Sequence, residues 1–238
     1  MLSNTARFLM ASAAASLVAL GSAHANAQTC GDISDAALDI VPGGTFVGTG
    51  ATFFTQAVKD AFGYTSTDIH FLWGSTSPNS AKYYDHVVAG TYFQQITNIL
   101  DIAPGDVIVV DATATYSGHT MIVREVEAWE GPVKEILPAM NPVFASTRQW
   151  AVGIVDSTTS VHGCGSAYPD SRWSGNCTAG TFTAGPGTAF TRLYTDPAGV
   201  IQGHSWSVTS GATYYSPTTR PLAVGRVTPC PPIIPPAI

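Results

Sequence analysis

A histidine on a short apolar strand is the residue of this chain best placed for acid–base chemistry. His119 opens the apolar run His119–Val123, and a second apolar run, Val107–Val110, precedes it across a turn-rich segment. Two such runs joined by turn residues predict a β-hairpin. A histidine fixed on a strand can act as a general base, because its unperturbed pKa lies close to neutrality. A hydrogen-bonded structural histidine would give the same pattern.

The cysteines are the second set of reactive side chains. Their number is even, which favours disulfides in an exported chain. Three pairings are possible; we expect Cys164–Cys177, which closes a Gly/Ser-rich loop, and Cys30–Cys230, which ties the two ends together. In the alternative interpretation one thiol, foremost that of Cys30, is a nucleophile and its partner cysteine stays unpaired.

Three histidines at distant positions raise the question of a zinc site. His119, His162 and His204 include no close pair at ligand spacing, so we expect neither a metal nor another cofactor. His162 and Asp170 flank Cys164 and could orient each other, but the simpler interpretation is that both decorate a long loop.

The first residues predict export. Arg7 precedes an apolar stretch from Phe8 to Leu20, and small residues then lead to Ala23-His24-Ala25 or Ala25-Asn26-Ala27. This pattern is typical of a secretory signal peptide, here residues 1–27, with cleavage before Asn26 or Gln28. The stretch is shorter than the roughly 20 residues that span a bilayer. We therefore expect a secreted or periplasmic protein without a transmembrane segment.

The composition limits the classes of partner that we expect for this chain. The chain has 238 residues and a formal net charge of −6, and no basic cluster interrupts it, so nucleic acid is not an expected partner. The mature chain is long enough for one sizeable core. We expect a single domain over residues 28–228, followed by a Pro-rich tail over 229–238.

The order of predicted elements is helical first and then β. Residues 31–50 are Gly- and Asp-rich and predict an entry loop, residues 51–62 a helix ended by Gly63, residues 65–78 an irregular segment and residues 80–89 a short helix. Either Thr49 or Thr52 could cap the first helix. An α+β arrangement follows. The expected strands lie near 107–111, 118–127, 150–156, 188–194, 201–206 and 222–227.

Three sequence segments resemble papain-like cell-wall peptidases of the NlpC and CHAP types. They are residues 104–110 (PGDVIVV), 117–123 (SGHTMIV) and 152–158 (VGIVDST), and the likeness covers about residues 45–210. The resemblance implies a papain-like α+β domain, with N-terminal helices packed on an antiparallel sheet or half-barrel. It also implies a cysteine at the start of the helix, a histidine base and an orienting polar residue on the next strand. His119 and Asp156 match the last two, and Gly118 would let a substrate backbone come close. Asp156 could instead cap the turn that follows it.

The chain departs from that family at the nucleophile. When Phe54 is matched to the phenylalanine of the family's Cys-Ser-Gly-Phe motif, Ala51 takes the cysteine position and Thr52 the serine position. Ala51 has no nucleophilic atom, and the hydroxyl of Thr52 is far less acidic than a thiol.

Three functional interpretations follow. The first is a catalytically impaired relative of peptidoglycan peptidases or amidases that binds a cell-wall peptide or glycan. The second is an active cell-wall hydrolase that uses Thr52 or Cys30. The third is an unrelated secreted β-rich binding or structural domain. Trp73 and Trp206 are the aromatic residues we expect in the cleft, where they could stack on sugar rings.

Overall fold

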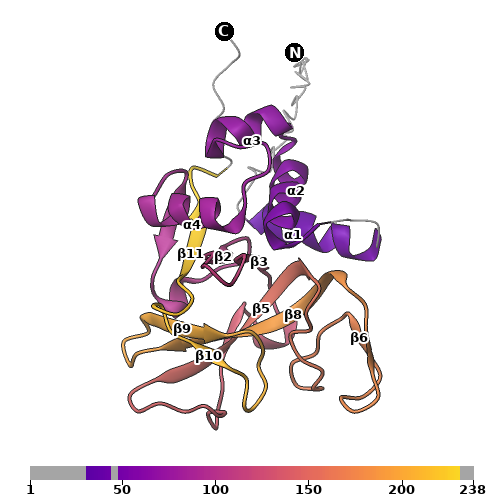
Figure 1. The fold of residues 1–238 in the computed structure, drawn as a ribbon, viewed down its shortest axis with the longest axis vertical. Coiled ribbons are helices and arrows are strands. Elements are labelled where there is room, and N and C mark those ends of the chain that lie inside the picture. The colour runs from indigo at the N-terminus through magenta and orange to yellow at the C-terminus, as the bar shows by residue number, and fades with distance from the viewer. Residues whose placement is uncertain (1–30, 44–47, 231–238) are drawn as a thin grey trace, which may run out of the picture.

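In the computed structural model, which describes residues 31–43 and 48–230, helices gather at one end of the molecule and long antiparallel strands at the other (Figure 1). The predicted α+β class is confirmed. The predicted signal peptide, Cys30 and most of the predicted Pro-rich tail lie outside the described residues.

In the described ranges, four α-helices precede the sheet. They are α1 (Gly31–Ile40), α2 (Gly50–Phe62), α3 (Ser66–Trp73) and α4 (Ser80–Ala89), and the short 3₁₀ turns are η1 (Val41–Gly43), η2 (Ile99–Asp101) and η3 (Glu127–Trp129). The helices predicted over 51–62 and 80–89 are confirmed. Gly63 ends α2 in the left-handed conformation, with φ of 67°, as its position predicted.

Two segments predicted to be irregular are helical. Residues 31–50 contain α1, whose Ile33 and Ala37 are buried one helical turn apart. Residues 65–78 contain α3, which opens with a capping box between Thr65 and Asp68. Both predictions were wrong: the Gly and Asp residues of the first segment, and Gly74 and Pro78 of the second, indicate a loop, but burial and capping decide these two helices.

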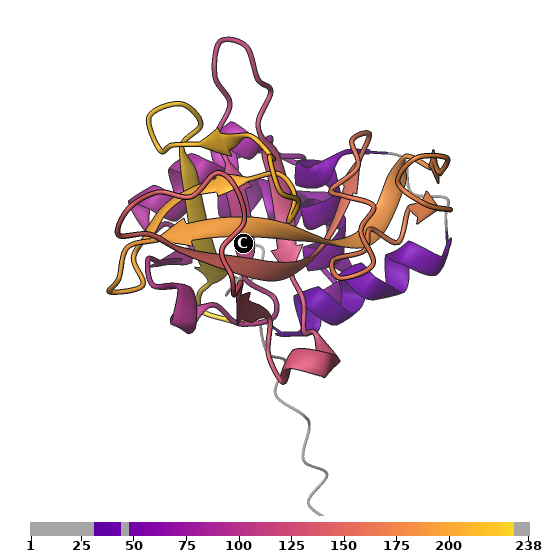
Figure 2. The ribbon, with the colours of Figure 1, turned by 90° about the horizontal axis from the view of Figure 1, so that it is seen from below.

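An antiparallel sheet, with nine strands among the described residues, forms the body of the fold. Its order is β1-β11-β2-β3-β5-β8-β9-β10, with β4 added on β5. The bounds are β1 (Phe93–Ile96), β2 (Val107–Val110), β3 (His119–Val123), β4 (Val133–Glu135), β5 (Arg148–Thr158), β8 (Gly185–Thr195), β9 (Ile201–Ser205), β10 (Tyr214–Tyr215) and β11 (Leu222–Val227), and a separate pair holds β6 (Trp173–Ser174) and β7 (Thr181–Phe182). The predicted β2–β3 hairpin forms, with Val110 opposite His119. Viewed from below, the long β5 and β8 ribbons cross the molecule with the helices behind them (Figure 2).

The main core lies between the helices and the sheet. An aromatic cluster holds them together: Phe54 of α2 packs edge-on against Tyr83 of α4 at 4.9 Å, and Trp73 of α3 stacks on Phe93 at 5.6 Å between ring centroids. All four side chains are buried. This packing fixes α2 against β3 and so positions the start of the helix.

The predicted disulfide Cys164–Cys177 is present and closes the loop that carries β6. Cys230 is also disulfide-bonded, and its predicted partner, Cys30, lies outside the described residues. None of the helices in the described ranges combines the length and the apolar character that crossing a bilayer requires.

Candidate functional site

The start of α2 lies directly against the ring of His119. A Cβ atom added at Gly50, the first residue of α2, would lie 2.8 Å from the His119 Cε1 atom and would overlap the backbone oxygen of Thr120. Only glycine therefore allows this close approach of helix and strand. The packing brings the first turn of the helix to the histidine.

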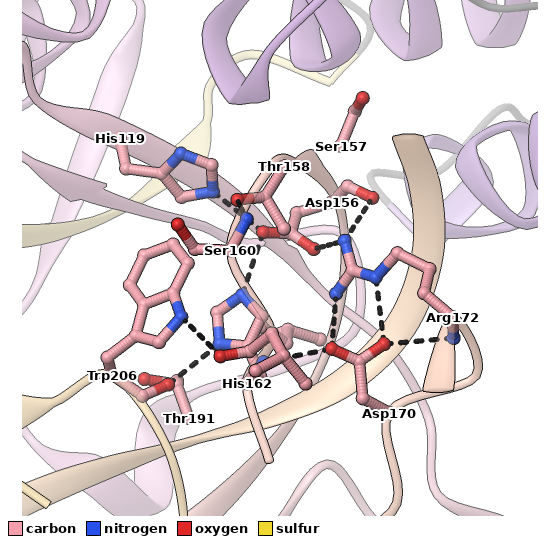
Figure 3. Close-up of polar contacts among 12 residues, drawn as sticks. His119, Asp156, Ser157, Thr158, Ser160, His162, Asp170, Arg172, Thr191 and Trp206 are labelled. Carbon is pink, nitrogen blue, oxygen red and sulfur yellow. Dashed lines mark hydrogen bonds and ion pairs between the residues drawn. The ribbon is translucent and has the colours of Figure 1, made fainter. Parts of the chain in front are cut away.

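His119 forms a buried hydrogen bond to Asp156. Its Nε2 atom lies 2.7 Å from Asp156 Oδ2, and the Asp156 side chain is fully buried within β5. A carboxylate only accepts, so Nε2 carries the proton and donates it. No hydrogen bond to the His119 Nδ1 atom forms within the described part of the chain. The Nδ1 atom lies on the side of the ring away from Asp156 (Figure 3).

The same carboxylate oxygen also binds a second histidine. His162 Nε2 lies 3.0 Å from Asp156 Oδ2, while its Nδ1 atom lies 2.7 Å from the Trp206 carbonyl oxygen. Both ring nitrogens of His162 thus face oxygen atoms, one of β5 and one of the residue that follows β9. The Trp206 ring stacks on the His162 ring at 3.9 Å and meets His119 edge-on at 4.8 Å between centroids.

A buried arginine completes the network (Figure 3). Arg172 donates from Nη1 to Asp156 Oδ1 at 2.9 Å, and its Nε and Nη2 atoms donate to the two oxygens of Asp170 at 2.8 and 3.1 Å. The guanidinium of Arg172 therefore binds both carboxylates of the cluster and links Asp170 to Asp156.

The pKa of Asp156 reflects both its burial and these contacts. Burial acts to raise the pKa, but His162, the hydrogen bond from His119 and the Arg172 guanidinium together hold the pKa of Asp156 well below its usual range. The ionised Asp156 fixes the tautomer of His119, which is the task of an orienting carboxylate beside a general base.

Two pockets adjoin the exposed edge of His119. One, of about 470 Å³, is bordered by Trp206, Tyr215 and Arg220; the other, of about 330 Å³, is bordered by Ala51 and Thr52. They share Thr49, Ser117, Gly118 and His119. At Gly118, φ is 79° and a Cβ would lie 2.8 Å from Ser80, so glycine is required for the turn into β3.

We call the two pockets that share His119 the groove, and the predicted nucleophile position, Ala51, borders it. Ala51 borders the smaller pocket, and the residue packed on the His119 ring is its neighbour Gly50. Neither residue has a nucleophilic atom. Thr52 borders the same pocket and is exposed; Thr49, the N-cap of α2, borders both pockets and makes no side-chain capping bond. Among the described cysteines none is free.

Two predicted roles require correction. Trp73 was expected in the cleft, but it is fully buried in the aromatic core because α3 is a helix that turns it inward. The suggestion that Asp156 caps a turn is also wrong, since β5 continues to Thr158 and the carboxylate binds side chains instead. Trp206 does border the larger pocket.

The sequence interpretation missed the residues that surround Asp156 and hold it in place. The interpretation of His162 and Asp170 as loop decoration is wrong, because both are buried; the alternative, that they orient each other, agrees with the His162 backbone N–H donating to Asp170 Oδ2 at 2.9 Å. Arg172 was not singled out at all. The available signal was the cluster of three ionisable residues within a stretch otherwise rich in Ser, Thr and Gly.

His119, Asp156 and His162 could also ligate a divalent cation, because their ligand atoms lie within 4.8 Å of one another. A His162 Nδ1 atom that donates to a carbonyl is usual in metal sites. However, ligands of a tetrahedral zinc at about 2.0–2.1 Å stand roughly 3.3 Å apart. The histidine–carboxylate contacts of 2.7 and 3.0 Å are direct hydrogen bonds, and a metal would have to separate them. His204 is not part of this group.

Comparison with known proteins gives one distant relative to report. The chain is 27% identical over 180 residues to the uncharacterized protein R653 of Acanthamoeba polyphaga mimivirus, an alignment that covers 74% of this chain and 75% of the viral protein. No family model and no solved structure matches.

Proposed function

We propose that this chain is an exported papain-like domain of the NlpC/CHAP type that binds a peptide or glycopeptide of the cell envelope without cleaving it. The observation that carries the proposal is the His119–Asp156 pair, complete and buried, which faces a helix start where Gly50 and Ala51 offer no attacking atom. A site that keeps a general base and the carboxylate that orients it, but has no nucleophile, is consistent with a hydrolase that has become a binding protein.

The order of the elements along the chain supports the papain-like part of the proposal. A helix start, a histidine on the following hairpin and a carboxylate on the neighbouring strand come in the family order, and β3 pairs directly with β5. The use of the two ring nitrogens also fits, since Nε2 is held by the orienting residue and Nδ1 is left toward the helix side of the groove.

Binding would use this free nitrogen. An unprotonated Nδ1 atom accepts a hydrogen bond from an amide N–H or a hydroxyl group, both of which peptidoglycan stems and sugars supply. Trp206 offers an apolar ring at the same pocket. Without a thiol, no covalent acyl intermediate forms, so the ligand leaves the groove intact.

An active hydrolase is the second candidate, because Thr52 and Thr49 place hydroxyl groups on the groove beside His119. A histidine can activate a hydroxyl when it lies within hydrogen-bond reach. In this case the groove would release cleaved fragments rather than retain the ligand.

Incubation of the mature protein with purified peptidoglycan sacculi tests the proposal. We expect the protein to cosediment with sacculi, His119→Gln to reduce cosedimentation at least about tenfold, and mass spectrometry to find no soluble muropeptides. The exposed His70 provides a control: His70→Gln should bind as the native protein does. Muropeptide release that is lost in His119→Gln would establish the hydrolase instead. Failure to cosediment would overturn the binding role.

A further inference from the structure

Arg220 is held between two tyrosine rings at the larger pocket. Its Cζ atom lies 4.0 Å from the ring centroid of Tyr116 and 3.8 Å from that of Tyr215. The three residues come from the β2–β3 connection, from β10 and from the residues just before β11, and all three border the pocket that also contains His119. Aromatic rings on both faces of a guanidinium fix its plane and leave only its edge for hydrogen bonding.

That edge has no hydrogen-bond or ion-pair partner among residues 31–43 and 48–230. Among the arginines within the described ranges, Arg220 alone has a guanidinium with neither a hydrogen bond nor an ion pair, whereas Arg172 and Arg226 bind carboxylates and Arg192 is surrounded by carbonyl oxygens. The residues that border the larger pocket include no aspartate or glutamate. A partly buried cation is thus oriented toward a pocket without a counter-ion.

We propose that Arg220 binds a carboxylate group of the ligand in a bidentate arrangement. A planar fork of N–H donors matches the two oxygens of a carboxylate, and such charge-assisted pairs are among the stronger hydrogen bonds of proteins. The other polar groups at the pocket, including Ser117 and Ser160, are neutral, so one negative charge is balanced by one positive charge. This inference rests on the proposed binding function of the groove and narrows its ligand to one that carries a carboxylate close to the group bound by His119.

NMR spectroscopy of the ¹⁵N-labelled mature protein tests the inference with three probes. They are acetyl-trialanine with a free carboxylate, the same peptide as its C-terminal amide, and inorganic phosphate. We expect the free acid to shift the Arg220 Nε–Hε and Trp206 indole signals saturably, and the amide to bind at least about tenfold more weakly. Phosphate should bind more weakly than the acid, because the pocket offers a single cation.

Arg220→Gln should remove the difference between acid and amide, whereas Arg148→Gln, on an exposed arginine, should preserve it. Equal affinity for acid and amide, tighter binding of phosphate, or the absence of any saturable shift at Arg220 would overturn the inference. The sacculus experiment and the NMR experiment can fail independently of each other. If sacculi bind through His119 and Arg220→Gln has no effect on either assay, the binding function stands and the carboxylate site is wrong. If the acid binds at Arg220 while sacculi do not bind, the carboxylate site stands without the proposed function.

Discussion

The Nε2 atom of His119 on β3 lies 2.7 Å from the Oδ2 atom of Asp156 on β5, within a cluster that water scarcely reaches. Because Asp156 also contacts His162 and accepts from Arg172, its charge holds three side chains in place, including the ring of His119. The stability of the fold and the chemistry of the groove therefore depend on the same carboxylate.

Asp156→Asn should lower the free energy of unfolding by about 3–5 kcal/mol, the usual cost of leaving buried charges without their partner. Urea denaturation at pH 7 measures the change. Asp35→Asn, at an exposed position of α1, serves as the matched control and should change stability by less than about 0.5 kcal/mol. A loss for Asp156→Asn as small as that of the control would show that the cluster contributes no net stabilisation.

The same carboxylate predicts acid sensitivity. The pKa of Asp156 in the folded protein is held well below the usual value of an aspartate, so the unfolded chain takes up the proton first as the pH falls. The contribution of Asp156 to stability is therefore complete above the unfolded pKa and is lost as the pH falls toward the lower, folded pKa. Denaturation midpoints measured from pH 6 to pH 2 should fall more steeply below about pH 4 for the native protein than for Asp156→Asn. Parallel curves would contradict this assignment.

The contact between α2 and β3 can be tested at Gly50. Gly50→Ala would force a methyl group against the His119 ring and the Thr120 backbone, and it should cost about 1–3 kcal/mol of stability. At Gly131 an added Cβ meets no atom within 4 Å, so Gly131→Ala is the control and should be nearly neutral. Equal urea midpoints for the two variants would show that the helix does not lie against the histidine.

A thiol placed at the predicted nucleophile position should be activated. Ala51→Cys puts sulfur in the first turn of α2 and on the pocket that His119 borders, where its pKa should fall below that of a free thiol. We expect it to react with iodoacetamide at pH 6–7 about tenfold faster than Thr67→Cys, which occupies the first turn of α3 away from any of the site residues. The comparison controls for the helix dipole. Equal rates would place position 51 outside the reach of His119.

His204 provides a second pH dependence, away from the His119–Asp156 pair. Burial first, and the nearby positive charge of Arg220 second, lower the pKa of His204 to about 4 from 6.5. A histidine that is buried in its neutral form stabilises the fold fully above pH 6.5, and this contribution, of up to about 3 kcal/mol, is lost as the pH falls from 6.5 to 4. His204→Gln should flatten the stability profile across this window, whereas His70→Gln should not. An unchanged profile in His204→Gln would contradict the shift.

Local patterns were sufficient to predict the strands that carry the site. The runs at 107–110 and 119–123 are apolar, are separated by turn residues and form a hairpin with buried residues throughout, so their sequence and their environment agree. α3 was missed although its capping box, Thr65 to Asp68, is visible in the sequence. α1 has a weaker local signal, and its burial against α2 decides its conformation.

The rest of the site depends on contacts between distant parts of the chain. His162 and Arg172 meet Asp156 only because the segment after β5 folds back onto that strand, and nothing in its Ser- and Gly-rich composition predicts the return. Arg220 likewise meets Tyr116 across more than 100 residues of sequence. Aromatic residues were a poor guide by themselves: Trp73 lies in the core and Trp206 at the pocket, and only the fold distinguishes them.

The most direct test is a ¹⁵N-histidine NMR titration of the mature protein with purified soluble muropeptides at pH 7, followed by mass spectrometry of the ligand. The account predicts a proton on His119 Nε2, a saturable shift of the Nδ1 signal, and muropeptides recovered intact. A proton on Nδ1, an Nδ1 signal that the ligand does not move, or cleaved muropeptides at the end of the titration would contradict it.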